Sequence, residues 1–166
     1  PWKEILREYI QAGVKTDYRM LPPSKKYLWM PLYMPALAGE HLELAVALDT
    51  SGSISDKLLA RFATEVASIA DQFESWRIHL FHCDARVAGY YQLSSDDDSD
   101  WPEALTQFKG RGGTDFRPVF EEMASRGVDM DASLLIYFTD LYGTFPKNSP
   151  SYPVLWAATN DQPVPF

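Results

Sequence analysis

Three oxygen-bearing side chains, Asp49, Ser51 and Ser53, stand at alternate positions directly after the apolar run of residues 44–48. In an extended or gently turning chain, side chains two residues apart point to the same side. One carboxylate and two hydroxyls grouped in this way form a hard-oxygen site of the kind that Mg²⁺ prefers. The same residues also suit a simple turn from a strand into a helix, in which Ser and Asp accept hydrogen bonds from the first helical N–H groups.

Two distant segments carry further oxygen ligands. Thr114 lies in the sequence GGTD just before a predicted helix, and Asp140 directly follows the apolar run of residues 133–139. In an open α/β sheet, ligands bind at the carboxyl ends of the strands, near the point where the strand order reverses. We therefore expect three separate segments to bring their oxygen atoms to one edge of a sheet, which is a stronger signal than any one segment alone.

The elements that must position these side chains follow from hydrophobic periodicity. Strands are predicted from apolar runs and helices from apolar residues at helical spacing. The strands are expected at residues 44–48, 76–83, 86–93, 133–139 and 154–159, and the helices at residues 54–74, 101–108 and 117–125. This order predicts an α/β fold, a Rossmann-like doubly wound sheet that is mostly parallel, with one antiparallel edge strand from the hairpin. The short, proline-containing connection of residues 141–153 argues against a full crossover helix.

Residues 1–39 are expected to precede the α/β domain of residues 40–166 as a helix and an arm. Residues 2–12 have the spacing of a helix that ends at Gly13. Its inward face is predicted to carry Ile5, Leu6, Tyr9 and Ile10. Residues 20–39 hold four prolines among aromatic and Met side chains, which excludes a regular helix and favours an ordered arm packed across the domain.

The order Asp-x-Ser-x-Ser, then a distant Thr, then a distant Asp resembles the von Willebrand factor A (VWA) fold and its metal-ion-dependent adhesion site. The resemblance covers roughly residues 42–159. It implies that Ser51, Ser53 and Thr114 bind Mg²⁺ (or Mn²⁺ or Ca²⁺) directly, and that Asp49 and Asp140 bind it directly or through water. It also implies that a remaining position on the metal takes a carboxylate from a protein partner.

More narrowly, the segments LDTSGSI, FHCDA, GRGGTDFRPVF and IYFTDLYG resemble a bacterial VWA-like domain. In that family the domain is the C-terminal part of predicted metallopeptidase-like proteins, whose upstream part would carry a His-Glu-x-x-His motif. The chain has only His41, His79 and His82, none in that spacing, so we expect such a peptidase to lie outside it. One departure from the family is that Asp140 is followed by Leu141 where Gly is usual, which would reshape this edge without removing the carboxylate.

Other chemistry-bearing residues near the predicted site have weaker patterns. Asp84 ends the strand beside the central one, and it is either a turn residue or a hydrogen-bond acceptor for the metal ligands; Asp115 is a candidate for the second role. His82 and Cys83 are neighbours on a strand and so point to opposite faces, which excludes a Cys-His nucleophile pair. The acidic run of residues 94–100 is typical of a solvated loop, with Ca²⁺ binding as the alternative, although it lacks the fixed Gly and Glu of an EF-hand.

Composition limits the function classes. The net charge of -8 argues against a nucleic-acid surface and against binding to an anionic membrane. No apolar run is long enough to cross a bilayer. The single Cys83 cannot form an internal disulfide, which favours a reducing compartment, and we expect a cytoplasmic protein. Because the chain begins with Pro1 rather than Met, we expect a fragment of a longer protein.

The sequence therefore favours a noncatalytic, Mg²⁺-dependent module that binds a protein through an acidic residue. The acidic net charge disfavours such a partner at long range, unless the metal and the basic residues Lys109, Arg111 and Arg117 offset it. A Mg²⁺-dependent hydrolase such as a phosphatase is an alternative, but an aspartyl nucleophile at Asp49 would be expected to have a second carboxylate where Ser51 stands. A structural domain with a vestigial site is the other alternative.

Overall fold

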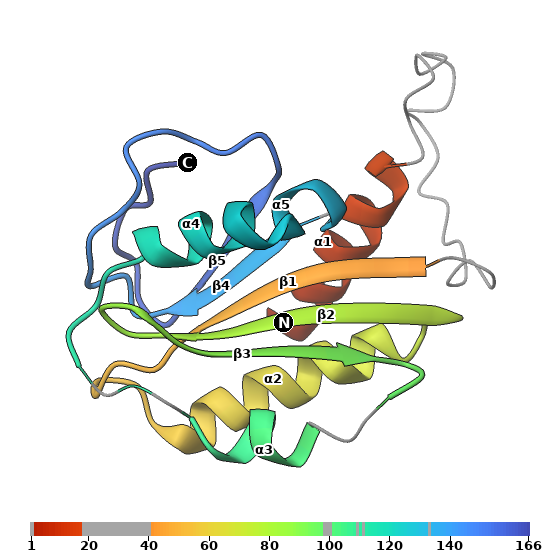
Figure 1. Cartoon of the computed structure of the whole chain (residues 1–166), viewed down its shortest axis with the longest axis horizontal. Helices are drawn as coiled ribbons and strands as arrows, with labels where there is room; N and C mark the ends of the chain where they lie inside the picture. The colour runs from red at the N-terminus through yellow and green to blue at the C-terminus, as the bar shows by residue number, and fades with distance from the viewer. Residues whose placement is uncertain (1, 18–40, 98–100, 109, 111, 133) are drawn as a thin grey trace.

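The computed structural model describes residues 2–17, 41–97, 101–108, 110, 112–132 and 134–166. A single sheet runs through the middle of the molecule, with helices on both of its faces (Figure 1). The strands are β1 (His41–Asp49), β2 (Ser75–Cys83), β3 (Val87–Ser94), β4 (Leu135–Thr139) and β5 (Val154–Ala158). The helices are α1 (Trp2–Asp17), α2 (Asp56–Ala70), α3 (Trp101–Thr106), α4 (Arg117–Arg126) and α5 (Val128–Asp131).

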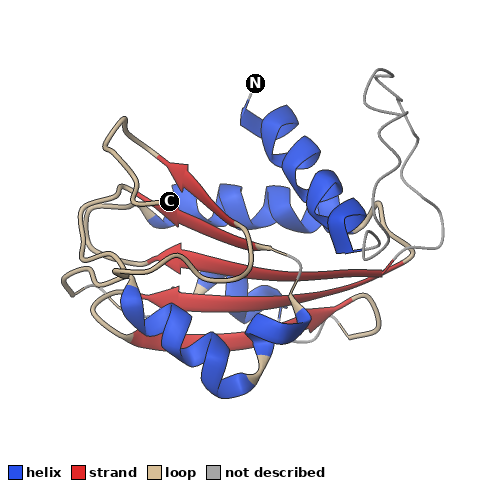
Figure 2. Ribbon diagram, turned by 90° about the horizontal axis from the view of Figure 1, so that it is seen from above, coloured by secondary structure: helices blue, strands red, loops and turns tan. Residues whose placement is uncertain are grey.

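The strand order is β3-β2-β1-β4-β5, with β1 at the centre. Strands β2, β1, β4 and β5 run parallel, and β3 pairs with β2 in the antiparallel sense, as the opposite arrowhead in Figure 2 shows. This confirms the predicted α/β fold with one antiparallel edge hairpin. The order reverses between β1 and β4, so the carboxyl ends of these two strands flank the position where such sheets bind ligands.

Strand β1 is buried on both faces, as its nearly continuous apolar run predicts. Its larger side chains, such as Leu44 and Leu48, pack in a core that also contains side chains of α1, α2 and α3. Its small side chains, Ala45 and Ala47, face the other core, which is covered by α4 and α5. The small residues leave room on that face for aromatic side chains from neighbouring strands, among them Tyr137 of β4.

Helix α2 follows directly from the chain segment that leaves β1. Ser55 is its N-cap, and the Ser55 hydroxyl accepts a hydrogen bond from the Leu58 amide at 3.3 Å. Its inward stripe buries Leu59, Phe62 and Val66, each of which contributes about 1.5–3 kcal/mol through burial. The packing of this stripe fixes the position of the residues just before the helix, which include the predicted ligands Ser51 and Ser53.

Two other connections in the chain are helix α4, which precedes β4, and the loop that joins β4 to β5. Helix α4 has Pro118 in its first turn and Gly127 directly after its last residue, as the sequence predicts. The chain from β4 to β5 forms no helix and lies as a loop, in agreement with the expectation from its prolines. In this loop the centroid of the Phe145 ring lies 4.8 Å from that of Phe116 and 5.1 Å from that of Trp156. These aromatic contacts cover apolar surface that a crossover helix would otherwise cover.

A buried polar network lies on β1 and β2 away from their carboxyl ends. The Glu43 carboxylate is 2.6 Å from the His79 ring, 2.9 Å from the His41 ring and 3.6 Å from the Arg77 guanidinium, and His79 also bonds the Tyr90 hydroxyl at 2.7 Å. Burial by itself would raise the pKa of Glu43, but the hydrogen bonds with His79 and His41 and the charge of Arg77 outweigh burial, so the pKa is lowered.

The N-terminal helix differs from its prediction at two points. It continues to Asp17 instead of ending at Gly13, since a glycine inside a helix costs only about 1 kcal/mol. Leu6 and Ile10 are buried against the domain, whereas Ile5 is 60% exposed, so the predicted inward face was too wide. The predicted arm of residues 20–39 lies outside the described residues. No helix in the described ranges is long and apolar enough to cross a bilayer.

Candidate metal site at the carboxyl end of the sheet

The candidate site lies where β1 and β4 end side by side. Asp49 is the last residue of β1, and Thr139 is the last residue of β4, followed at once by Asp140. The Thr139 hydroxyl donates a hydrogen bond to Asp49 Oδ2 at 2.6 Å, which ties the two strand ends together across the reversal in strand order. The predicted convergence of these two segments at one edge is therefore what the fold produces.

Hydrogen bonds join four of the five predicted ligands. The Ser51 amide donates to Asp49 Oδ1 at 3.0 Å, and the hydroxyls of Ser51 and Ser53 lie 3.0 Å apart. The Ser53 hydroxyl donates to Asp140 Oδ2, across a sequence separation of 87 residues. Together with the bond from Thr139 to Asp49, these contacts close a ring of side chains around the end of β1.

The two carboxylates of this ring are shielded from water to different degrees. Asp49 is fully buried, and Asp140 is 8% exposed. Burial raises the pKa of Asp49; hydrogen bonds from Thr139 and Ser51 oppose this effect, and the nearby negative charge of Asp140 adds to it. A cation placed between the two carboxylates would relieve both the desolvation and the mutual repulsion.

Thr114 reaches the same edge through backbone pairing. Asp115 forms a parallel bridge with Thr144, and the Phe116 amide donates to the Thr144 carbonyl at 3.0 Å. A Cβ added to Gly143 would lie 2.8 Å from Thr114 Cγ2, so the two residues are in close contact and Gly143 leaves space for the threonine. Thr114 is thus placed beside the loop that follows Asp140, with its methyl group next to Gly143.

Asp84 forms the turn that the sequence allowed, and its other hydrogen bonds go to the segment that carries Thr114. Its Oδ1 accepts the Arg86 amide at 3.1 Å, which makes the turn between β2 and β3. Its Oδ2 accepts the Gly112 amide at 2.9 Å, and its backbone carbonyl accepts the Asp115 amide at 2.9 Å. Asp84 therefore holds Gly112 and Asp115, which flank Thr114 in the glycine-rich loop (the sequence of residues 109–115). Its contacts with the site pass through that loop.

The Asp115 carboxylate is paired with Arg117. It binds the Arg117 guanidinium at 2.6 Å and accepts the Arg117 amide at 3.0 Å. The hydrogen bond from Arg117 lowers the pKa of Asp115 against a small opposing effect of burial. The structure therefore places Asp115 at the start of α4, where it stabilises the first turn of the helix.

Leu141 occupies the position where the family usually has Gly. Its φ angle is 64°, in the left-handed region that costs a non-glycine residue about 1–2 kcal/mol. The turn is nevertheless formed: the Leu141 amide donates to the Thr139 hydroxyl at 3.0 Å, and the Tyr142 amide donates to Asp140 Oδ1 at 3.1 Å. Leu141 therefore adopts the left-handed conformation that Gly would take at this position, and Asp140 keeps its contact with Ser53.

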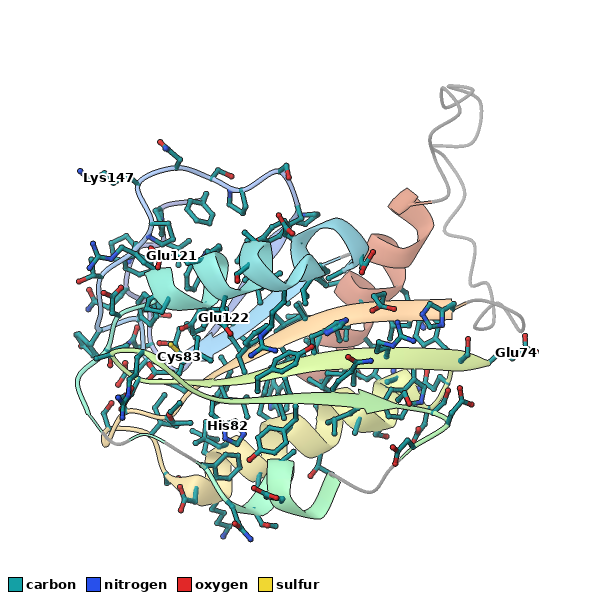
Figure 3. The ribbon with its side chains drawn as sticks, in the orientation of Figure 1. Glu74, His82, Cys83, Glu121, Glu122 and Lys147 are labelled. Atoms are coloured by element: carbon teal, nitrogen blue, oxygen red, sulfur yellow. The ribbon has the colours of Figure 1, made fainter. Side chains whose placement is uncertain are left out.

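His82 and Cys83 lie on opposite sides of the sheet, as Figure 3 shows. The His82 ring is buried and bonds the Ala104 carbonyl of α3 at 3.0 Å, so this histidine belongs to the core. The Cys83 thiol faces the α4 side, where burial raises its pKa to about 12. A thiol with so high a pKa stays protonated near neutral pH and is a poor nucleophile, which agrees with the exclusion of a Cys-His pair.

The donor set at this edge fits Mg²⁺ or another hard cation. Within the described ranges, no group of three or more His, Cys, Asp or Glu side chains is arranged to hold a metal ion. The candidate site contains only two carboxylates, and hydroxyls supply its other donors. Oxygen donors of both kinds suit Mg²⁺, which retains water on its remaining positions. Asp49, Ser51, Ser53 and Asp140 are already in contact, so little reorganisation would be needed to bring them to one ion.

Sequence reasoning missed Thr139 and Asn160. Thr139 bonds Asp49, and the Asn160 side-chain amide donates to the Asp140 carbonyl from the residues just after β5. A polar residue at the end of an otherwise apolar run, directly before a predicted ligand, could have indicated Thr139. Asn160 carries no such signal, because its place beside Asp140 depends on the pairing of β4 with β5.

Comparison with known proteins identifies the family. A family model described as a VWA-like domain (DUF2201) matches residues 44–166. The chain belongs to this family. An uncharacterized protein of Thermotoga maritima is 28% identical over 123 residues, which amount to 72% of this chain and 28% of that protein. The chain thus spans less than a third of the length of this relative, and the matched part of the VWA-like domain contains all five predicted ligands.

Proposed function

We propose that this VWA-like domain binds Mg²⁺ through Asp49, Ser51, Ser53, Thr114 and Asp140, and that the bound ion accepts a carboxylate from a protein partner. The observation that carries the proposal is the contact of the Ser53 hydroxyl with both Ser51 and Asp140. This contact brings the end of β1 and the end of β4 together in an arrangement of hydroxyl and carboxylate oxygens. A turn that served only to start α2 would need no partner from β4, since Ser55 already caps that helix.

The chemistry of the set favours an acidic ligand on the metal. Two carboxylates balance the two positive charges of Mg²⁺, and the serine and threonine hydroxyls are neutral. Because the remaining donors carry no charge, the negative charge of the site does not exceed that of the ion. One more carboxylate could therefore replace a water molecule on Mg²⁺. The domain would act as a binding module, with the ion as the point of contact. Any catalytic activity would lie in another part of a longer protein, such as the predicted metallopeptidase region.

Calorimetric titration of the domain with Mg²⁺ and with Mn²⁺ tests the metal site. We expect saturable binding by the wild type and loss of binding in the double variant Asp49→Ala with Asp140→Ala. Asp131→Ala, which removes an exposed carboxylate outside both the candidate site and the acidic run, is the matched control and should bind as the wild type does. Bound metal should also raise the melting temperature, because a ligand of the folded state stabilises it.

Equal heats in the wild type and the double variant would refute the proposed site, and the absence of any effect of millimolar Mg²⁺ would favour a vestigial site.

The partner chemistry needs a separate test. Peptides with a central Asp or Glu, and matched peptides with Asn or Gln, would be screened against the domain in Mg²⁺ and in EDTA. Binding that requires both the carboxylate and the ion is the expected result.

A further inference from the structure

We infer that Thr139 is a positioning residue of the metal site, one that holds Asp49 in the orientation needed to bind the ion. This inference rests on the proposed function, and it adds a residue outside the five predicted ligands. Thr139 is fully buried at the end of β4, and its neighbour in the sequence is the ligand Asp140. Asp49, to which it is bonded, is fully buried as well.

The direction of the hydrogen bonds at Thr139 is fixed by its neighbours. The Leu141 amide donates to Thr139 Oγ1 at 3.0 Å, so this oxygen already acts as an acceptor. An ionised carboxylate can only accept, and Asp49 Oδ2 lies 2.6 Å from the same oxygen. The hydroxyl proton of Thr139 therefore points to Asp49. This short, charge-assisted bond lies in a region shielded from water, where such bonds are strong.

The Asp49 carboxylate is consequently held at both of its oxygens. The Ser51 amide holds Oδ1 at 3.0 Å, and Thr139 holds Oδ2. If the Thr139 hydroxyl were removed, the hydrogen bonds from Ser51 would remain, but Asp49 Oδ2 would lose the donor from β4 that fixes its orientation. The Leu141 amide would also lose its acceptor, at the residue that already has a left-handed backbone. Residues that orient metal ligands in this way typically change metal affinity by about 10–100-fold when they are replaced.

The test uses Thr139→Val, which keeps the shape of the side chain and removes the hydroxyl, and Thr139→Ser, which restores it. Mg²⁺ affinity measured by calorimetry should fall by about 10–100-fold in Thr139→Val and return to within a few-fold of the wild type in Thr139→Ser. Thr159→Val, at an exposed threonine just after β5, is the matched control and should leave the affinity unchanged. Thr139→Ala serves as a second variant without the hydroxyl if Thr139→Val folds poorly.

A metal-free readout separates positioning from general stability. The amide resonance of Ser51, which reports its bond to Asp49, should shift in Thr139→Val without metal and return in Thr139→Ser. Wild-type affinity in both Thr139→Val and Thr139→Ala would overturn the inference and leave the metal site standing. A loss of stability with unchanged affinity would likewise overturn it, since it would show a role limited to joining the strands. If the wild type itself bound no Mg²⁺, the proposed function and the inference would both fail.

Discussion

Gly110 offers a direct test of how the glycine-rich loop positions Thr114. Its φ angle is 127°, a conformation that residues with a side chain rarely adopt. A Cβ added at this position would lie 2.3 Å from Thr50 Oγ1 and 3.3 Å from two carbon atoms of Asp84. Thr50 is fully buried beside Asp49, and Asp84 anchors the same loop, so neither side chain can move into solvent to make room.

We expect Gly110→Ala to destabilise the domain by about 2–6 kcal/mol. Backbone strain of this kind costs about 1–3 kcal/mol, and an extra carbon in a close-packed region costs about 1–3 kcal/mol more. The chain can relieve both only by lifting the loop away from Thr50 and Asp84. Such a movement would also displace Thr114, so the variant should bind Mg²⁺ more weakly than its loss of stability alone would explain.

Urea unfolding and Mg²⁺ calorimetry measure the two effects. The matched control is Gly113→Ala in the same loop, because no atom lies within 4 Å of its added Cβ, and it should change stability by less than about 0.5 kcal/mol. Combining Gly110→Ala with Thr50→Ala removes the atom that clashes, and the double-mutant cycle should recover about 1–3 kcal/mol. Wild-type stability and metal affinity in Gly110→Ala would refute the proposed packing of the loop.

Three further variants test the core. The pKa of Glu43 is lowered in the folded state, so its contribution to stability is present above the pKa of the unfolded chain and is lost as pH falls through the folded pKa. Urea unfolding at a series of pH values from about 7 down to about 3, the range in which carboxyl groups titrate, measures this loss. The free energy of unfolding should fall less over this range in Glu43→Gln than in the wild type. The buried Tyr137 hydroxyl makes no hydrogen bond of good geometry among the described residues and has the Cys83 thiol, a weak partner, beside it, so Tyr137→Phe should raise the free energy of unfolding by about 1 kcal/mol; a loss of stability would show that the contact with Cys83 is favourable. Ile10→Ala should cost about 2–4 kcal/mol and the exposed Ile5→Ala little, and equal effects would contradict the docking of α1.

The strands of this domain are predictable from the sequence because each is a short apolar run that ends in polar residues. The run that ends at Asp49 and the run before Asp140 both correspond to buried parallel strands, and their carboxyl ends meet as expected. The limits of α1 were less predictable. Its buried face depends on how Leu6 and Ile10 pack in the core beside α2, and Gly13 does not end the helix.

The candidate ligand residues can be proposed as a set from the sequence, but the hydrogen bonds that orient them cannot. Asp49, Ser51 and Ser53 are close in the sequence, so their spacing alone suggests a shared site. The bond from Thr139 to Asp49 depends on the register between β1 and β4, which no local pattern specifies. The bond from the Gly112 amide to Asp84 likewise depends on how the end of β2 meets the glycine-rich loop, where a Cβ at Gly112 would lie only 3.0 Å from Asp84 Oδ2.

The structure also offers a way to reconcile an acidic protein with an acidic partner. Hydroxyl groups donate to the two buried carboxylates: Thr139 donates to Asp49, and Ser53 donates to Asp140. A bound Mg²⁺ would neutralise both carboxylates. If position 51 were an Asp instead of Ser51, the site would have three negative charges around the ion and would repel an acidic ligand. The net charge of -8 slows the approach of such a ligand, but this long-range repulsion is screened within about 10 Å at ordinary ionic strength. Contact with the ion is not screened in this way. The proposed site would therefore make binding depend on the metal, and partner selection would rest on the short-range fit around it.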